Sequence, residues 1–375
     1  MAGAVYLDYN ATAPLRAEAA TAMSKAMRLT GNPSSVHRFG RLARRTVEDA
    51  RAEVAALVGA AADRVVFTGG GTEANNLALA GVGRRRIIVS AIEHDSVLEA
   101  APRAEVLPVR PDGTVSLPAL ADLLARSDQP ALVSVMLANN ETGVVQPVAE
   151  VAALAHRHRA LVHCDAVQAA GKIEVEMTAL GADLLSLSAH KFGGPQGVGA
   201  LVLAGTVELE AVQRGGGQER GRRAGTENVA AIAGFAAAAR VAAARRQDEW
   251  ARLSGLRDRL EAEVSRRVPG ARIVGAEAPR LPNTCCLMMP GLASETQVIG
   301  LDLAGVAVSA GSACSSGKVR PSHVLRAMGA GEAEADSAIR VSLGWASLPD
   351  DVDRFVEAWS GLCAGAATAA QAAAR

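Results

Sequence analysis

The sequence predicts an α/β fold in which helices cover both faces of a mostly parallel sheet. Short segments that are apolar throughout alternate with helix-length segments between about residues 65 and 205. Strands of this kind are typical of a sheet that is buried on both faces. The chain has 375 residues, which is long enough for two hydrophobic cores. Several predicted strands also end in reactive polar residues, at the sheet edge where α/β proteins bind ligands.

Seven apolar segments are the predicted strands of this sheet. They lie at residues 65–67, 87–89, 106–107, 132–137, 161–163, 184–188 and 200–203. Amphipathic segments at 72–80, 117–126 and 147–158 have the apolar spacing of helices and are predicted to connect the strands. This alternation of strands and helices indicates parallel pairing.

A smaller α+β domain is predicted to follow the sheet. Residues 226–266 are rich in Ala and Arg and contain no turn signal before Pro269-Gly270, so we interpret them as one long helix. Strands are expected near 272–275 and 284–289, and helices near 294–304 and 349–370. We therefore expect a large domain at 15–255 and a small domain at 256–375, joined by the N-terminal segment 1–14.

Charge and hydropathy argue against several classes of protein. The chain has 39 basic and 39 acidic residues, so its charge balance favours neither a nucleic-acid nor a membrane-surface partner. No segment reads as a signal peptide or as a membrane span. The five cysteines lack paired metal-binding spacing, and no metal site is expected. A cytoplasmic protein with reduced thiols is the simplest interpretation.

Lys191 is the most informative of the reactive strand ends. It closes Ser188-Ala189-His190-Lys191, directly after an apolar strand and before a glycine-rich turn. Lysine occurs at only four positions, namely 25, 172, 191 and 318, and all other basic residues are arginine. A desolvated lysine can form a Schiff base with an aldehyde, whereas an arginine stays protonated. Taken alone, Lys191 would be interpreted as a surface lysine in a turn.

Two further strand ends suit a phosphorylated aromatic cofactor. Glycines 69–71 lead into a helix that is predicted to begin near Thr72, and free backbone N–H groups there can bind phosphate. His94 follows the strand at 87–89 and could stack on a ring or move protons. Each has an ordinary alternative, because Gly-rich turns are common and a histidine can simply begin a helix.

Asp165 follows the strand at 161–163 and precedes Lys191 by about one strand–helix–strand unit. A carboxylate beside the nitrogen of a pyridine ring keeps that nitrogen protonated, and a pyridinium ring stabilises a carbanion. A carboxylate and an amine at this separation can flank one ring. The pair is therefore more specific than either residue alone.

The motifs around these residues closely resemble those of the cysteine desulfurases, which are pyridoxal-phosphate (PLP) enzymes of the class V aminotransferase group. The resemblance extends nearly from end to end of the chain. It rests on residues 6–12, 31–37, 68–76, 93–94, 139–143, 165–168, 188–191 and 223–228. It implies a fold type I PLP-dependent transferase, with a mixed, mostly parallel seven-stranded sheet in the large domain and a smaller α+β domain.

The resemblance also implies roles for single residues. Lys191 would carry PLP, Asp165 would lie at the ring nitrogen, and His94 would stack on the ring and handle protons at the substrate sulfur. Arg340 would bind the carboxylate of the substrate, with Asn10 and Asn140 as further substrate contacts. The other cofactor contacts would be Gly71, Thr72, Asn140, Gln168, Ser188, His190 and Thr226, the last reaching the active site of the neighbouring subunit in a homodimer.

A cysteine among small residues indicates which reaction is catalysed. Cys314 lies in Ser309-Ala310-Gly311-Ser312-Ala313-Cys314-Ser315-Ser316-Gly317, which resembles the nucleophile loop of the NifS/IscS-like subgroup. Ala310 stands where serine is frequent in that family. The resemblance implies conversion of L-cysteine to L-alanine, with a persulfide on Cys314 for an acceptor such as an iron–sulfur scaffold protein. Taken alone, a loop cysteine is most often a spectator.

Three alternatives remain open from the sequence. The chain could be a selenocysteine lyase, another class V aminotransferase, or a sulfur-delivery scaffold that has lost catalysis. The presence of Lys191, Asp165, His94 and Cys314 together argues against the last of these. Residues 364–375 show no clear counterpart of the extension with which longer relatives dock a scaffold, so the identity of the acceptor is also open.

Overall fold

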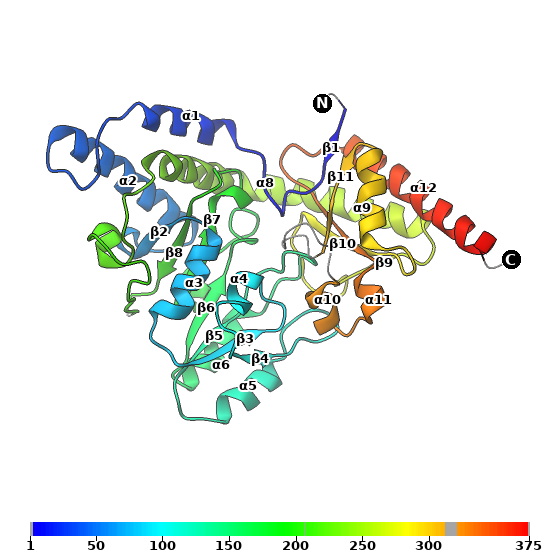
Figure 1. Cartoon of the computed structure of the whole chain (residues 1–375), viewed down its shortest axis with the longest axis horizontal. Coiled ribbons are helices and arrows are strands. Elements are labelled where there is room, and N and C mark those ends of the chain that lie inside the picture. The colour runs from blue at the N-terminus through cyan, green and yellow to red at the C-terminus, as the bar shows by residue number, and fades with distance from the viewer. Residues whose placement is uncertain (1–2, 206, 312–320, 374–375) are drawn as a thin grey trace.

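A computed structural model describes residues 3–205, 207–311 and 321–373 of the chain. Its centre is a seven-stranded sheet with the order β2-β8-β7-β6-β5-β3-β4 (Figure 1). β8 is antiparallel to both of its neighbours, and all other pairs are parallel. The strands are β2 (Val65–Thr68), β3 (Arg86–Ser90), β4 (Glu105–Leu107), β5 (Ala131–Ser134), β6 (Leu161–Asp165), β7 (Leu184–Ser188) and β8 (Gly199–Leu203). The predicted mixed, mostly parallel sheet is confirmed.

Neighbouring side chains of these strands are buried in different cores, which explains why the strands are apolar throughout. Leu132 and Leu184 pack in a core under α3, while Val133 and Leu185 pack in the larger core on the other face. The helices that connect the strands are α3 (Gly71–Gly81), α4 (Asp95–Leu98), α5 (Leu117–Ala125), α6 (Val148–Arg157) and α7 (Met177–Leu180). The predicted helices at 72–80, 117–126 and 147–158 are confirmed to within a residue or so at each end.

Two helices near the N-terminus were not anticipated. α1 (Ala17–Met27) and α2 (Arg38–Leu57) precede the sheet in sequence and pack against the long helix α8 (Val229–Arg267). α8 matches the long helix predicted at 226–266. Its first half contributes Phe235 to the larger core of the sheet, and its second half contributes Leu260 to a separate core. The expected domain boundary at 255–256 falls inside this helix.

The separate core belongs to a second layer of structure that packs around a small antiparallel sheet with the order β12-β13-β10-β9. This layer occupies the right side of Figure 1 and includes the C-terminal helix. Its strands are β9 (Arg272–Ile273), β10 (Thr284–Met288), β12 (Ser309–Ala310) and β13 (Ala338–Ser342). Its helices are α9 (Ser294–Leu303), α10 (His323–Ala327), α11 (Glu332–Ala335) and α12 (Pro349–Ala373).

The N-terminal segment connects the two sheets. β1 (Val5–Tyr6) pairs in parallel with β11 (Val306–Ala307), so the chain begins in the second layer. It then passes the end of β13, where Asn10 N donates to Ser342 Oγ, and reaches the turn after β7, where Ala13 N donates to His190 O. Residues 8–13 therefore lie between the two sheets. Three short 3₁₀ helices complete the described elements, at Ala62–Arg64, Ala189–Lys191 and Gln218–Gly221.

Within the described part of the chain, no helix combines the length and the apolar character needed to cross a membrane.

Candidate active site

A cavity of about 290 Å³ lies at the carboxyl ends of the central strands, where the N-terminal segment meets both sheets. Every predicted cofactor or substrate residue lines it except Thr226; these residues are Asn10, Gly71, Thr72, His94, Asn140, Asp165, Gln168, Ser188, His190, Lys191 and Arg340. Thr226 is exposed and lines neither this cavity nor the open hollow beside it. Cys314 lies outside the described residues.

One end of the cavity is built to bind an anion. α3 begins at Gly71, and no side chain caps its N-terminus, so backbone N–H groups of the first turn are available to a ligand. A Cβ at Gly71 would come within 2.9 Å of Val167 Cγ2, so a larger residue would have to displace Val167. Thr72 and Ser188 supply hydroxyl groups beside this turn. A phosphate group matches this set of donors.

His190 lies at the same end and is held neutral by its surroundings. Burial and the nearby charges of Lys191 and Lys172 lower the pKa of His190 to about 4. Its Nδ1 lies 3.2 Å from Thr12 Oγ1. A neutral imidazole can donate one hydrogen bond to a bound anion without adding charge to the site.

Asp165 and His94 are connected through two residues that the sequence prediction missed. Asn75 Nδ2 donates to Asp165 Oδ2 over 2.7 Å and to Ser96 Oγ over 2.8 Å. Ser96 Oγ lies 2.8 Å from His94 Nδ1, which also accepts from Ser96 N over 3.0 Å. Because a backbone N–H can only donate, Nδ1 carries no proton in this arrangement, and the neutral ring of His94 has its proton on Nε2.

The amine of Lys191 points at the N-terminal segment. Its Nζ donates to Asn10 O over 2.7 Å and to Ala11 O over 2.9 Å. Lys191 ends the 3₁₀ turn that follows β7, so the end of the strand and this turn together fix the position of the amine. Asp165, at the end of β6, lines the same cavity, and its Oδ1 accepts from Val167 N over 2.9 Å.

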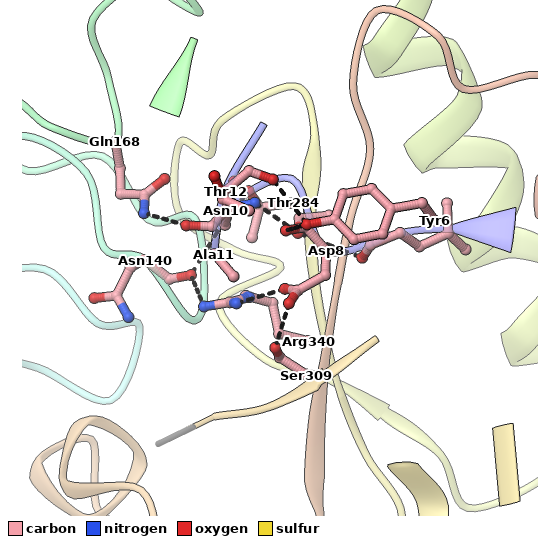
Figure 2. Close-up of polar contacts among 12 residues, drawn as sticks. Tyr6, Asp8, Asn10, Ala11, Thr12, Asn140, Gln168, Thr284, Ser309 and Arg340 are labelled. Atoms are coloured by element: carbon pink, nitrogen blue, oxygen red, sulfur yellow. Dashed lines mark hydrogen bonds and ion pairs between the residues drawn. The ribbon is translucent and has the colours of Figure 1, made fainter. Parts of the chain in front are cut away.

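Arg340, from β13 of the small sheet, also lines the cavity. Its Nη2 donates to Asp8 Oδ1 over 2.7 Å and its Nη1 to Asn140 O over 3.1 Å, as Figure 2 shows. Ser309 Oγ donates to the second oxygen of Asp8 over 2.8 Å. The buried Nε of Arg340 has no partner in the described structure. The guanidinium is therefore fixed in place where Arg340 lines the cavity, and its planar shape suits a carboxylate.

Glu141, next to Asn140, holds two residues that flank the cysteine segment. Ser322 Oγ donates to Glu141 Oε2 over 2.5 Å. On the other side, a Cβ on Gly311 would overlap the Glu141 carboxyl group. Burial raises the pKa of Glu141, while Ser322 and the nearby charges of His323 and Arg340 oppose this rise. The described ends of the segment at 312–320 thus meet at one carboxyl group beside the cavity.

The four described cysteines are poor candidates for a reactive thiol. Cys164, Cys285, Cys286 and Cys363 are buried. Burial raises the pKa of the Cys286 thiol to about 12 and that of Cys363 to about 11, and it raises the pKa of Cys164 and Cys285 well above the usual range. The prediction that Cys285 and Cys286 lie in a buried strand is confirmed by β10. In the described ranges, no cluster of side chains could hold a metal ion.

The residues that line the cavity fit PLP. The donor set at the start of α3 suits a phosphate, Asp165 offers a carboxylate, and Lys191 offers an amine. A side chain at position 71 would clash with Val167, so this helix start favours glycine. Sequence reasoning missed Asn75, Ser96, Asp8 and Lys172 as parts of this site. An asparagine four residues after Gly71, one turn along the predicted helix, was the available signal for Asn75.

Comparisons with known proteins agree with this geometry. A model of the family described as aminotransferase class V matches residues 5–355. The chain is 41% identical to an IscS-like cysteine desulfurase of Mycobacterium tuberculosis, with 98% of each chain covered. It is 45% identical to a cysteine desulfurase of Cereibacter sphaeroides, with 94% of each covered. The solved structure of a NifS-like protein from Rickettsia africae superposes with a TM-score of 0.89 at 36% identity, covering 96% of this chain and 99% of that one.

These matches extend over nearly the whole length of both partners, and the family match at 5–355 includes every residue that lines the cavity. The chain therefore belongs to the class V aminotransferase family, in its group of IscS- and NifS-like cysteine desulfurases.

Proposed function

We propose that the chain is a PLP enzyme that converts L-cysteine to L-alanine and leaves the sulfur as a persulfide on Cys314. The observation that carries this proposal is the cavity that Lys191, Asp165, His94 and Arg340 line together. Bound PLP would supply an electron sink for the charge that remains when a proton leaves the α-carbon of the substrate. The residues of the chain would bind PLP and L-cysteine and would move protons between them.

The residues divide this work according to their positions. Lys191 Nζ would hold the cofactor aldehyde, and its amine would carry the α-proton of the substrate once the substrate amine has displaced it. Asp165 keeps the ring nitrogen protonated, and Asn75 fixes its carboxylate. His94 lines the cavity, where it would stack on the ring and would transfer a proton at the substrate sulfur through Nε2. Thr72, Ser188 and His190 bind the phosphate, while Gln168 binds the ring oxygen.

Arg340 binds the carboxylate of L-cysteine, supported by Asn10 and Asn140. Asp8 holds one nitrogen of its guanidinium, and Nε has no partner in the described structure. A planar guanidinium held in this way orients a carboxylate more strictly than a flexible amine would. This contact fixes the α-carbon of the substrate relative to Lys191.

Cys314 is the proposed acceptor of the sulfur. Its thiolate attacks the substrate sulfur, so that an S–S bond forms while the C–S bond of the substrate breaks. The electron pair of the broken bond stays with the carbon fragment, and protonation of that fragment yields alanine. The high pKa values of the four described thiols support Cys314 as the nucleophile.

A homodimer with shared active sites is part of the same proposal. Thr226 is exposed and does not line the cavity of its own chain, as expected if it reaches the cavity of a second copy. Large apolar side chains are exposed in and beside α1 and α2, among them Met27, Val36 and Phe39, with 67%, 87% and 58% of their surface accessible. Such exposure is typical of a surface that a partner covers.

The proposal extends to a sulfur-acceptor protein, such as an iron–sulfur scaffold, that takes the persulfide sulfur. For the substrate, a further solved structure gives support. It is that of SspA in complex with cysteine. SspA is 28% identical to this chain, and the match covers 91% of this chain and 99% of SspA. Cysteine as a ligand of a related protein supports L-cysteine as the substrate here.

The decisive experiment compares wild type with Cys314→Ala, and uses Cys363→Ala as the control that removes a buried thiol. With a thiol reductant present, we expect PLP-loaded wild type and Cys363→Ala to form alanine and sulfide in equal amounts from L-cysteine, without a keto-acid co-substrate. Cys314→Ala should keep the visible absorbance of bound PLP and lose sulfide formation and the protein-bound persulfide. Lys191→Ala should lose that absorbance as well.

Three results would overturn the assignment. A Cys314→Ala protein that releases sulfur at the wild-type rate would exclude the persulfide step. Alanine formation that requires a keto acid would indicate an aminotransferase. Activity with selenocysteine but not with cysteine would indicate a lyase instead.

A further inference from the structure

Two of the four lysines in the chain converge on Asn10. Lys191 Nζ donates to the backbone oxygen of Asn10 over 2.7 Å, and Lys172 Nζ donates to its side-chain oxygen Oδ1 over 2.9 Å. Lys172 Nζ also donates to Gln168 Oε1 over 2.9 Å. Lys172 does not line the cavity, whereas Asn10 and Gln168 do. Its described hydrogen bonds therefore reach the cavity through those two amides.

The amine of Lys172 sits in an environment that is costly for a charge. Both described partners of its Nζ are amide oxygens rather than carboxylates. Burial, together with the charges of Lys191 and Arg340, lowers the pKa of Lys172 well below its usual range. Burying a cation without a counter-charge is unfavourable. The arrangement is therefore best explained by a negative group that is brought to the cavity by a ligand.

Lys172 also determines which way two amides face. Lys172 Nζ donates to both side chains, so Gln168 and Asn10 each present their carbonyl oxygen to it. The NH₂ groups of the two amides have acceptors that agree with this orientation. Gln168 Nε2 donates to Asn10 O over 2.9 Å, a contact drawn in Figure 2, and Asn10 Nδ2 donates to Thr284 Oγ1 over 2.8 Å.

The result is that Gln168 presents an NH₂ group, and not an oxygen, on the side away from Lys172. One of its two N–H groups is used by Asn10 O, and the residue lines the cavity. A cation bound to the oxygen of an amide also polarises the amide and makes its N–H groups stronger donors. The group that such a donor would stabilise is an anionic oxygen.

We propose that Lys172 is a positioning residue that orients and polarises Gln168 for the ring oxygen of PLP. The inference rests on the proposed function, because it requires PLP in this cavity. The oxygen on the pyridine ring can carry negative charge, which makes it the counter-charge that Lys172 otherwise lacks. Lys172 acts through Gln168 and does not touch the reacting atoms.

The test measures binding of two ligands to the apoprotein. The first ligand is PLP, and the second is an analogue of PLP that lacks the ring hydroxyl and keeps the aldehyde and the phosphate. Binding is followed by equilibrium dialysis for wild type, Lys172→Met and the control Lys25→Met, which removes an exposed lysine of α1. Methionine approximates the length of lysine without its charge.

We expect Lys172→Met to weaken PLP binding by about tenfold or more, the loss expected for a hydrogen-bond chain to a charged group. Its affinity for the analogue should stay within about twofold of wild type, and Lys25→Met should match wild type with both ligands. A purely structural role would weaken both ligands alike, because both need the same cavity.

Equal losses for both ligands, or no loss for either, would overturn the inference. If Lys172→Met does not fold, Lys172→Gln is measured by the same criterion, since it keeps hydrogen-bond donors and removes the charge. A wild-type apoprotein that binds no PLP would instead overturn the proposed function itself. The two failures are therefore distinguishable.

Discussion

Asn75 Nδ2 donates a 2.7 Å hydrogen bond to Asp165 Oδ2, from the first turns of α3 to the end of β6. The same nitrogen donates to Ser96 Oγ, which contacts His94. The amide of Asn75 thus helps to orient both the carboxylate of Asp165, which would face the ring nitrogen, and the imidazole of His94, which would transfer a proton. Asn75 itself also lines the cavity.

The first prediction concerns this amide. Asn75→Ala should lower kcat by about 10- to 100-fold at full PLP loading, because a charge-assisted hydrogen bond to Asp165 is lost and a buried carboxylate oxygen is left without its donor. Steady-state kinetics of alanine formation measure the effect. Asn76→Ala is the matched control, because the amide of Asn76 binds the backbone oxygens of Thr72 and Ser96. Equal kcat losses in the two variants would contradict the role given to Asn75.

Asp8 provides the second prediction. Its carboxylate holds Arg340 Nη2 over 2.7 Å and accepts from Ser309 Oγ. Asp8→Asn removes the charge and keeps the shape, so Arg340 becomes less firmly fixed for the substrate carboxylate. We expect KM for L-cysteine to rise by about tenfold while kcat changes little, the pattern for loss of ground-state binding.

The control for this variant is Asp353→Asn, which breaks an exposed ion pair with Arg259 near the start of α12. Exposed pairs contribute little, so its KM should equal that of wild type. A large fall in kcat in Asp8→Asn without a change in KM would show that Asp8 serves the chemical step and not substrate binding.

The third prediction concerns packing behind the N-terminal segment. A Cβ on Gly344 would overlap the ring of Tyr9, the residue before Asn10. The ring of Tyr9 also packs edge-on against Trp345, with ring centroids 5.4 Å apart. Gly344→Ala therefore has to move Tyr9, and we expect a loss of about 1–3 kcal/mol in the free energy of unfolding.

Gly255→Ala serves as the control for this substitution. Gly255 is exposed within α8, and a Cβ there would meet nothing within 4 Å. Alanine at such a helical position should stabilise the protein by about 0.5–1 kcal/mol. Urea unfolding of both variants measures the two changes. Similar midpoints for Gly344→Ala and wild type would show that the Tyr9 ring can move without cost.

The site residues that could be predicted from the sequence are those that come at the ends of strands. Lys191 and Asp165 each come at the end of an apolar segment, and parallel strands bring such ends to one edge. The seven-stranded sheet and the long helix α8 were predictable for a related reason, because apolar runs and the absence of turn signals are local properties.

The parts that were not predicted depend on contacts between distant segments. Asp8 and Arg340 are separated by 332 positions, and nothing local to either residue indicates the other. Lys172 is one of four lysines in the sequence, and its role follows only from the amides that surround it. The strand β13 was missed because the motif around Arg340 was interpreted as a binding segment and not as a strand.

The fourth prediction concerns Glu93, whose carboxyl group is fully buried next to the cavity. Oε1 accepts from Ser90 Oγ over 2.6 Å and from Met136 N over 2.7 Å, while Oε2 has no partner in the described structure. Burial raises the pKa of Glu93 to about 8, opposed by these two hydrogen bonds. The native protein therefore holds the proton of Glu93 at pH values at which the unfolded chain has released it.

The direction of the pH effect follows from this difference. Between the unfolded pKa near 4.5 and the folded pKa of about 8, the native state binds more protons than the unfolded state. The contribution of Glu93 to stability is therefore complete below the lower value and is lost as the pH rises through the upper one. The loss is on the order of 1.4 kcal/mol for each pH unit that separates the two pKa values.

Glu93→Gln removes this titration and keeps the acceptor for Ser90 and Met136. We expect the variant to gain stability relative to wild type as the pH rises from about 5 to about 9, because only wild type must either retain a proton or bury a charge. Urea unfolding at a series of pH values measures the difference between the two free energies of unfolding. The control Glu277→Gln, at an exposed position, should differ from wild type by a constant amount over the same range. A constant difference for Glu93→Gln as well would show that Glu93 is ionised in the native protein, with its burial compensated by a group outside the contacts described above.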